Sequence, residues 1–464
     1  MFAHELLSEG SLLHSATWLP RLPEVMLMNQ TRNRKPREPE TPTQKTGPTH
    51  STEIPGRHGA DIDTARRLAL PILWGLKDKG SAEPSRDEWH ALGVTLNQGD
   101  PLADDVAAWM REIGARTGWQ RFEKALAEGV ESVRNDAALH KFLSHAASDP
   151  PWLDRGAVER GIAASGRAGA AGMLALRDLG LWAGYRASAI NQTLIRTGAL
   201  EGSAQRRVAQ TTTWWMACNE SGGMDVGGDG YRMTLRVRVV HALVRASLLR
   251  SPDWDRAWLG LPVNQLDMQA TYLAFSVIYL IGQRMLGVPV RKQEAEDIMH
   301  LWRYIAWLMG VDEKLLVASE VEGRVALYRN LLSQPAADET SKKLGRALMD
   351  EPLDRRYQRF AWLRGHWNRQ VHLSIIRFFL DAEGMESLGL PKGVLPWFPM
   401  LTGPPRFIFG LLVRMTPETE SWWTRRGRQA QHALFETLHG ERTTPKSPLD
   451  ELRARLGRRA NPVS

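Results

Sequence analysis

The stretch from Tyr231 to Arg250 reads YRMTLRVRVVHALVRASLLR, and its pattern decides the fold class that we predict. In an α-helix, residues three and four positions apart share one face. This spacing places Arg238, His241 and Arg245 together, while the other positions are mostly apolar. A helix that is apolar almost all round must be buried. We therefore expect this helix to lie in the interior of a helical protein.

Two guanidinium groups on a buried helix require anionic partners, because a charge taken out of water is costly unless it is paired and hydrogen-bonded. In one interpretation, Asp or Glu side chains of neighbouring helices neutralise Arg238 and Arg245, and His241 is a hydrogen-bonded core residue. In the other, the partner is haem, whose propionates bind the arginines and whose iron takes an imidazole nitrogen. The spacing alone leaves both interpretations open.

Composition is that of a soluble globular protein with many tryptophans. Of 464 residues, 43% are hydrophobic and 24% charged, and 18 Trp stand against 7 Tyr and 11 Phe. Such a number of indoles is typical of a thick apolar interior or a lipid-facing surface. The net charge is +8, with basic runs in both tails, TRNRKPR at 31–37 and RARLGRR at 453–459, and we find no zinc finger, RNA-binding aromatic motif or convincing helix-turn-helix. We therefore predict no nucleic-acid partner.

Cysteine content and targeting signals suggest where the protein resides. Cys218 is the single cysteine, which excludes an intramolecular disulfide and an all-cysteine iron–sulfur cluster. The first residues, MFAHELLSEG, do not form a secretory signal. The most apolar stretch, Thr271 to Val290, is interrupted by Gln283 and Arg284, which is typical of a buried helix. We expect a cytoplasmic protein, with peripheral membrane association as a further option; the sequence does not indicate the oligomeric state.

The predicted organisation is one all-α domain between two tails. Residues 29–59 are rich in Pro, Thr and charge, and such a segment cannot bury enough apolar surface to offset its ordering entropy. We therefore predict a largely disordered segment over 1–61. Helical periodicity then continues with almost no alternating strand pattern. It predicts a single multi-helix domain with a globin-like core over 62–439 and a C-terminal tail over 440–464.

An unusual Gly/Ala run occupies residues 161–186, GIAASGRAGAAGMLALRDLGLWAGYR. Each glycine costs about 1 kcal/mol of helix stability relative to alanine. So many glycines in a helical pattern have two interpretations. Either the glycines allow other backbones or a flat ligand to approach closely, or the two helices simply pack loosely. The sequence does not choose between these interpretations.

Three consecutive motifs carry a resemblance to a known family. They are RVRVVHALVRASLL at 236–249, WDRAWLGLPVNQLDMQATYLAFS at 254–276 and EAEDIMHLWRYIAWLMGVDEKLL at 294–316. In order and spacing they resemble the rubber oxygenase (latex-clearing protein) and MpaB-type oxygenase family, over roughly residues 61–332. The resemblance implies an all-helical fold with b-type haem.

The resemblance also implies roles for residues of the central helix. The family's Arg-x-x-His-x-x-x-Arg pattern falls on Arg238, His241 and Arg245. It implies that His241 is the axial ligand of the haem iron and that the two arginines bind the cofactor.

A second family pattern, Arg-x-x-Lys-Thr, falls on Arg207, Gln210 and Thr211, which the resemblance implies are catalytic residues of the distal pocket. Here the chain departs from rubber oxygenases, because glutamine replaces lysine and the distal glutamate would fall near Asn191. A glutamine is a weaker, neutral donor than a lysine. The departure puts the rubber-cleaving mechanism in doubt while leaving haem binding as expected.

These patterns lead to one main functional prediction and two alternatives. We predict a haem b-dependent oxygenase that uses dioxygen on an apolar, olefinic or isoprenoid substrate. The first alternative is a non-catalytic helical protein that binds haem or lipid, favoured by the missing lysine and carboxylate. The second is a di-iron carboxylate oxidase, which needs two Glu-x-x-His motifs, whereas only Glu436-x-x-His439 matches fully.

A last stretch predicts a surface role. Residues 388–415, LGLPKGVLPWFPMLTGPPRFIFGLLVRM, combine aromatic and basic residues, and five prolines interrupt them too often for a membrane span. Aromatic residues beside basic ones suit the headgroup boundary of a membrane. The stretch therefore predicts peripheral membrane contact, unless it simply wraps the helical core.

Overall fold

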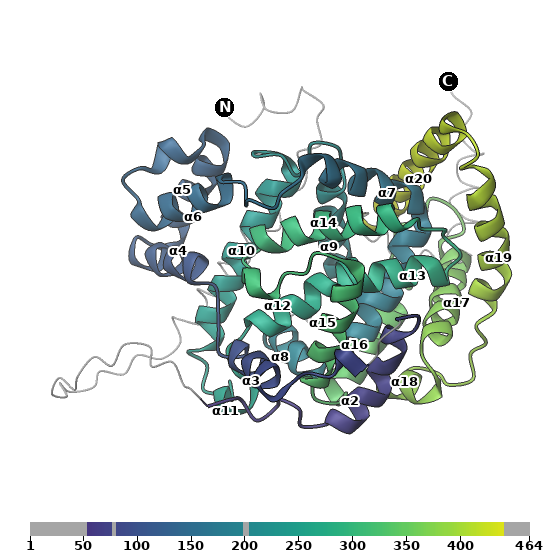
Figure 1. The fold of residues 1–464 in the computed structure, drawn as a ribbon, viewed down its shortest axis with the longest axis horizontal. Coiled ribbons are helices and arrows are strands. Elements are labelled where there is room, and N and C mark those ends of the chain that lie inside the picture. The colour runs from purple at the N-terminus through teal and green to yellow at the C-terminus, as the bar shows by residue number, and fades with distance from the viewer. Residues whose placement is uncertain (1–52, 77–79, 198–203, 440–464) are drawn as a thin grey trace, which may run out of the picture. The chain divides into compact units, whose positions relative to one another are not determined.

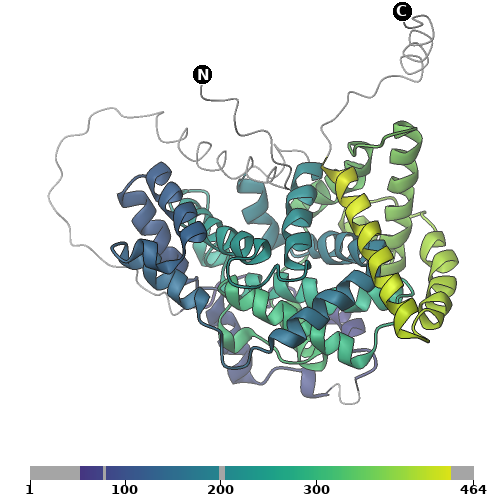
Figure 2. The same ribbon diagram turned by 90° about the horizontal axis from the view of Figure 1, so that it is seen from above.

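The computed structural model describes residues 53–76, 80–197 and 204–439, and helices are its only regular elements there (Figures 1 and 2). The all-α prediction is confirmed. The first described helix begins at Ile62 and the last ends at Leu438. The predicted C-terminal tail and most of the predicted N-terminal segment lie outside the described residues. The chain divides into two compact units, and residues 101–147 form the described part of the smaller one.

The smaller unit consists of α4 (Pro101–Glu112), α5 (Ala115–Glu128), the 3-10 helix η3 (Val130–Val133) and α6 (Ala137–Ala147). Its core contains Phe122 and Phe142, whose ring centroids lie 6.3 Å apart. Gly118 of α5 packs against Met110 of α4, where a Cβ atom would lie 2.7 Å from the Met110 side chain. The unit thus has its own small apolar interior.

The larger unit contains all the predicted site residues. In chain order its helices are α2 (Ile62–Ala69), η1 (Leu70–Leu73), η2 (Gly80–Ala82), α3 (Arg86–Thr95), α7 (Arg155–Leu174), η4 (Ala175–Trp182), α8 (Ser188–Arg196), α9 (Ala204–Cys218), α10 (Asp229–Leu248), α11 (Arg256–Leu259), α12 (Gln265–Leu273), η5 (Ala274–Ile278), α13 (Tyr279–Met285), α14 (Lys292–Leu308), η6 (Glu313–Leu315), α15 (Glu320–Leu332), α16 (Glu339–Asp350), η7 (Glu351–Leu353), α17 (Ala361–Phe379), α18 (Ala382–Ser387), α19 (Trp397–Leu412) and α20 (Pro417–Leu438).

Helix α7 carries the glycine-rich run and packs between α14 and α20. A Cβ atom on Gly161 would lie 2.4 Å from the carbonyl oxygen of Asp297 in α14. On the α20 side, a Cβ atom on Gly427 would lie 2.1 Å from the carbonyl oxygen of Gly166. Real side chains cannot fit at these separations. The glycines therefore allow backbones to approach closely, as one of the two interpretations of the run predicted.

Two π-helical segments, η4 and η5, lie against each other in the interior. Each continues directly from an α-helix, η4 from α7 and η5 from α12. Segments of this kind are rare and often occur at functional sites. Sequence periodicity does not reveal them, because a single wider turn hardly changes the pattern of apolar residues.

The predicted disorder up to residue 61 does not hold for residues 53–61, which pack onto the larger unit. Arg57 is 1% exposed, and one of its nitrogens lies 2.8 Å from each carboxylate oxygen of Asp267. His58 lies between Ser333 and the carbonyl oxygen of Trp89, at 2.8 and 3.0 Å. These partners are distant in sequence, so composition alone could not predict that the segment is ordered.

Residues 397–412 form the regular helix α19 despite Pro404 and Pro405 in its interior. Proline lacks an N–H donor and usually kinks a helix. Here Gly287 and Gly410 allow close approach, because a Cβ atom on Gly287 would lie 2.1 Å from the carbonyl oxygen of Gly403 and one on Gly410 would lie 2.6 Å from Pro289. Tertiary packing thus holds α19 against the rest of the larger unit along its length. Within the residues that the structure covers, no helix is long and apolar enough to span a bilayer.

Candidate functional site

Helices α9 and α10 form an antiparallel pair that brings the two predicted motifs together. Near the loop 219–228 that connects the two helices, the indole Nε1 of Trp214 donates to the hydroxyl of Thr234 at 2.9 Å. Two helical turns farther from this loop, the register of the pair places Arg207 opposite His241. The charge of Arg207 lowers the pKa of His241 in agreement with this placement.

His241 lies deep in the larger unit with its imidazole in the neutral form. Burial lowers its pKa to about 4, and the positive charges of Arg245 and Arg207 lower it further. The Nδ1 atom is buried and has no hydrogen-bond partner among the described residues. The residue nevertheless keeps part of its surface accessible. A neutral imidazole whose buried Nδ1 atom has no described partner is suited to be a metal ligand.

Arg238 is bound by protein groups. Its guanidinium donates to the Asp100 carboxylate at 2.6 and 2.9 Å and to the carbonyl oxygen of Leu308 at 3.1 Å. Arg238 and Asp100 are each 3% exposed. For this arginine, a protein carboxylate is therefore the anionic partner, as the first interpretation of the buried helix predicted.

Arg245 is also buried, and its Nη1 atom donates to the carbonyl oxygen of Val263 at 2.7 Å. Val263 has a positive φ of 51°, which is unusual for a β-branched residue. The positive charge of Arg245 is the second largest cause of the low pKa of His241. Arg245 therefore contributes positive potential at the imidazole.

The predicted distal residues share one face of α9 and keep accessible surface. Arg207, Gln210 and Thr211 are each partly exposed. Arg207 lies beside Tyr185. Burial raises the pKa of Tyr185, and the charge and hydrogen bond of Arg207 oppose part of this rise. The three residues thus line the same side of the helix as predicted.

Asn191 lies near the position where the resemblance would place the distal glutamate of rubber oxygenases. It is fully buried in α8, and its amide nitrogen donates to the carbonyl oxygen of Tyr185 at 2.7 Å and to the Ser341 hydroxyl at 3.2 Å. The side chain therefore supports packing between α8 and neighbouring elements. Its neutral amide cannot serve as a general base in the way that a carboxylate can.

An aromatic cluster next to the pair of helices was not predicted as part of the site. Trp214 of α9 contacts Phe275 of the π-helical segment η5 edge-on, with ring centroids 5.2 Å apart. Phe275 in turn stacks on Trp302 of α14 at 4.8 Å. Only the tertiary packing joins these three rings, although the step from Thr211 to Trp214 along one helical face hints at the first. Trp214 follows Gln210 and Thr211 by four and three residues on α9, so the cluster begins on the same helical face as these two residues.

The alternative di-iron site finds no support in the described residues. No group of three or more His, Cys, Asp or Glu side chains is placed there to hold a metal ion. Both ring nitrogens of His439 already have partners, the Thr213 hydroxyl at 2.6 Å and the carbonyl oxygen of Phe435 at 2.9 Å. The Glu436-x-x-His439 motif is therefore part of the end of α20.

Comparisons with known proteins agree with this architecture. The family model of the ER-bound oxygenase mpaB/B'/Rubber oxygenase catalytic domain matches residues 166–402, just over half of the chain. Rubber oxygenase of Streptomyces sp. (strain K30) is 27% identical over 206 residues, which are 43% of this chain and 48% of that relative. The alignment thus spans about half the length of that relative.

A solved structure of latex clearing protein LCP in the closed state is similar in fold. Its TM-score is 0.53 at 21% sequence identity, and the match covers 73% of this chain and 91% of that one. At this identity the similarity concerns the fold alone. The family match includes α9, α10 and the aromatic cluster. The chain therefore belongs to the ER-bound oxygenase mpaB/B'/Rubber oxygenase family.

Proposed function

We propose that this protein is a haem b-dependent oxygenase that uses dioxygen on an apolar, olefinic or isoprenoid substrate. The observation that carries the proposal is the state of His241. Its imidazole is neutral, its Nδ1 atom has no described hydrogen-bond partner, and the residue keeps accessible surface deep in the molecule. A core histidine normally satisfies its buried nitrogens, so this one fits the role of an axial iron ligand.

The charges around the imidazole fit the propionates of haem. Arg245 and Arg207 both lower the pKa of His241, so positive potential surrounds it. We propose these two arginines as the groups that attract the propionates. Arg238 would act indirectly, because its guanidinium is bound by Asp100 and serves to hold α10.

We propose that Gln210 and Thr211 lie on the side of the site where dioxygen binds. When bound, haem iron supplies the activation of dioxygen. The amide of Gln210 and the hydroxyl of Thr211 can each donate one neutral hydrogen bond there. The cluster of Trp214, Phe275 and Trp302 keeps the neighbouring space apolar, which suits a hydrocarbon substrate and excludes water.

A second candidate function, non-catalytic binding of haem or lipid, is favoured by two positions. Gln210 lacks the charge of the lysine in rubber oxygenases, and Asn191 is committed to packing against Tyr185 and Ser341. In that case the site would bind its ligand without turnover. A measurement of oxygen consumption by haem-loaded protein with a polyisoprene oligomer separates the two candidates.

The decisive experiment is absorption spectroscopy of protein expressed with supplemented haem precursor, followed by a pyridine haemochrome assay. We expect a Soret band and about one b-type haem per chain. A purified, folded protein without a Soret band would eliminate the oxygenase proposal and the haem-binding alternative together. Haem without oxygen consumption would leave the alternative.

We also propose peripheral membrane contact through residues 388–415, the basis of which follows.

A further inference from the structure

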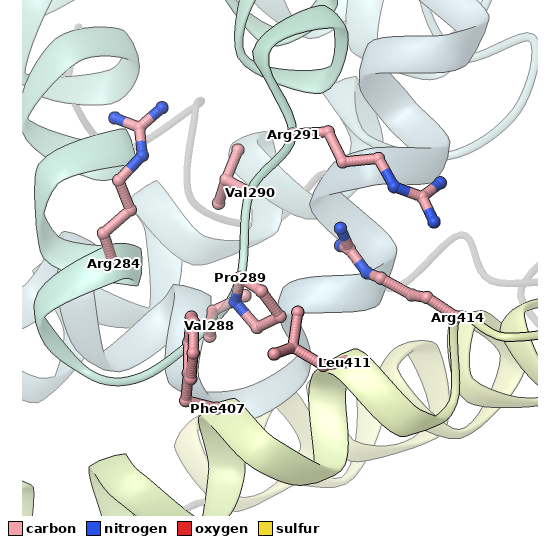
Figure 3. Close-up of a pocket in the computed structure, with 8 residues that line it drawn as sticks. All are labelled: Arg284, Val288, Pro289, Val290, Arg291, Phe407, Leu411 and Arg414. Carbon is pink, nitrogen blue, oxygen red and sulfur yellow. The ribbon is translucent and has the colours of Figure 1, made fainter.

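A pocket of about 530 Å³ lies where α19 meets the segment between α13 and α14. Its walls are apolar in the middle, where Pro289 faces Phe407 and Leu411 of α19. Figure 3 shows Arg291 and Arg414 at one end of these apolar side chains and Arg284 at the other. The pocket is therefore amphipathic, with an apolar floor between cationic ends.

Helix α19 exposes a continuous apolar stripe beside this pocket. Met400, Leu401 and Ile408 are 61%, 69% and 59% exposed, and Leu412 is 55% exposed. Steps of seven and four residues along the helix place Leu401, Ile408 and Leu412 on one face, and Met400 lies at its edge. Helix α17 packs alongside α19 (Figure 1) and adds exposed side chains at its start, namely Trp362, Leu363 and Trp367. Exposed apolar patches of this extent mark interaction surfaces.

The arginines of the pocket belong to ion-pair groups in which cations outnumber anions. Arg284 shares Glu320 with Arg324, at 2.5 and 2.7 Å. Arg414 shares Glu294 with Arg167, at 3.0 and 2.9 Å. In both groups one carboxylate serves two guanidinium groups.

Arg291 is held more loosely. It is 53% exposed and lies 3.5 Å from Glu420, which is also 3.6 Å from Arg167. The two groups together therefore contain five arginines and three carboxylates among these paired residues. The excess positive charge is clearest at the end with Arg291 and Arg414, because at the Arg284 end the Glu296 carboxylate also lies close, accepting from the Glu320 backbone N–H at 3.3 Å.

Arg406 adds an unpaired positive charge at the same place. Its guanidinium donates to the carbonyl oxygen of Leu286 and forms no ion pair with a described residue. Burial lowers its pKa, with no carboxylate to oppose the effect. Arg406 immediately precedes Phe407 of the pocket wall, and Leu286 lies two residues before Val288. An anion bound here would relieve the cost of this half-buried charge.

We propose that this pocket binds the headgroup of an anionic phospholipid while the apolar stripe of α19 enters the membrane surface. The inference names the partner of the membrane contact proposed above and rests on that proposal. It is independent of haem binding.

Charge favours a membrane over a second copy of the chain as the occupant. Residues 388–415 contain Lys392, Arg406 and Arg414 and no acidic residue. Two such surfaces would repel each other in a symmetric dimer, whereas an anionic lipid surface attracts them. Aromatic and aliphatic side chains beside arginines also suit the boundary between headgroups and acyl chains.

The test is sedimentation of the full chain with vesicles of phosphatidylcholine alone or phosphatidylcholine with phosphatidylglycerol. We expect binding to the anionic vesicles that weakens with added salt, and little binding to the neutral ones. Arg291→Gln should lower the partition coefficient about fivefold, since one basic residue near an anionic surface contributes about 1 kcal/mol. Leu401→Ser should lower it about tenfold, because it removes an apolar side chain from the stripe.

The matched controls are Arg256→Gln and Leu249→Ser, which replace an exposed arginine and an exposed leucine. Arg256 lies in α11, far from α19 in Figure 1. Both controls should bind vesicles like the unmodified chain. Because all four positions are exposed, circular dichroism should show a folded protein in each case.

Three outcomes would overturn the inference in distinguishable ways. Equal binding to neutral and anionic vesicles, unaffected by Arg291→Gln, would remove the headgroup pocket but keep the membrane contact. Absence of binding to either vesicle would remove both. A dimer in analytical ultracentrifugation that Leu401→Ser dissociates, together with no vesicle binding, would assign the stripe to a second copy of the chain.

Discussion

The carboxylate of Asp100 binds the guanidinium of Arg238 through two hydrogen bonds, of 2.6 and 2.9 Å, inside the larger unit. The carbonyl oxygen of Leu308 takes a third hydrogen bond from the same arginine. One turn along the helix lies His241, so the pair fixes the part of α10 that carries the proposed iron ligand. The two partners are 138 residues apart in the chain.

We predict that Asp100→Ala strongly destabilises the protein. The substitution leaves the Arg238 guanidinium buried without its carboxylate, and breaking a buried pair in this way typically costs about 3–5 kcal/mol. Urea denaturation followed by circular dichroism measures the effect. Asp63→Ala is the control. The Asp63 side chain is 94% exposed although it pairs with Arg66, so this substitution should change the denaturation midpoint little. Equal effects of the two substitutions would contradict a structural role for the Asp100–Arg238 pair.

The proposed roles of His241 and Gln210 predict different effects on haem. His241→Ala should lose the b-type haem, or hold it only when imidazole is added. Gln210→Ala should keep the haem and change oxygen affinity or turnover, since its amide is proposed to act on the oxygen side. Absorption spectra and oxygen-consumption rates measure both.

His432→Ala is the control for this pair of variants, because His432 is 54% exposed and paired with Glu220. It should keep both haem and activity. An unchanged haem spectrum in His241→Ala would place the axial ligand on another residue.

The buried His372 predicts that the free energy of unfolding decreases as the pH is lowered from 6.5 to 4. Burial lowers the pKa of His372 to about 4. The imidazole is therefore neutral in the folded state, which fits an Nδ1–H donor to Asp178 at 2.8 Å and an Nε2 acceptor from Arg355 at 2.9 Å. The unfolded state binds the proton more readily in this range, so stability is fully present above pH 6.5 and is lost as the pH falls toward 4.

The size of the effect is roughly 3 kcal/mol for His372, from a pKa difference of this extent. His372→Gln should lower the stability at pH 7, because the hydrogen bonds are disturbed, and make its decrease between pH 6.5 and 4 shallower. Denaturation midpoints measured across this range check the prediction. Exposed His90 provides the control: if His90→Gln flattened the profile as much, the buried imidazole would not be the cause.

The close contact between α7 and α20 predicts a large effect of adding one methyl group. Gly427→Ala would place a Cβ atom 2.1 Å from the carbonyl oxygen of Gly166, so the helices must separate. Overpacking of this kind costs about 1–3 kcal/mol. Thermal unfolding should show a clearly lower Tm. Gly184→Ala has no atom within 4 Å of the new Cβ and should leave the Tm unchanged or slightly raise it.

Local spacing in the sequence was enough to predict that residues 231–250 form a buried helix and that the chain is all-α. The reason is that helical periodicity depends on neighbours three and four residues apart. The same spacing indicated that Arg207, Gln210 and Thr211 share a face of one helix, and the motifs carried the resemblance to the family. The composition of 161–186 left close backbone contacts as one of the open interpretations, and the structure was needed to choose it.

Only the tertiary structure decided which distant groups complete these local patterns. It paired Arg238 with Asp100 and set Arg207 opposite His241. It also made α19 a helix through two prolines, and it left the Nδ1 atom of His241 without a described partner. The physical reason is that burial and ion pairing depend on contacts between residues far apart in the chain. Periodicity carries no information about which of those residues meet.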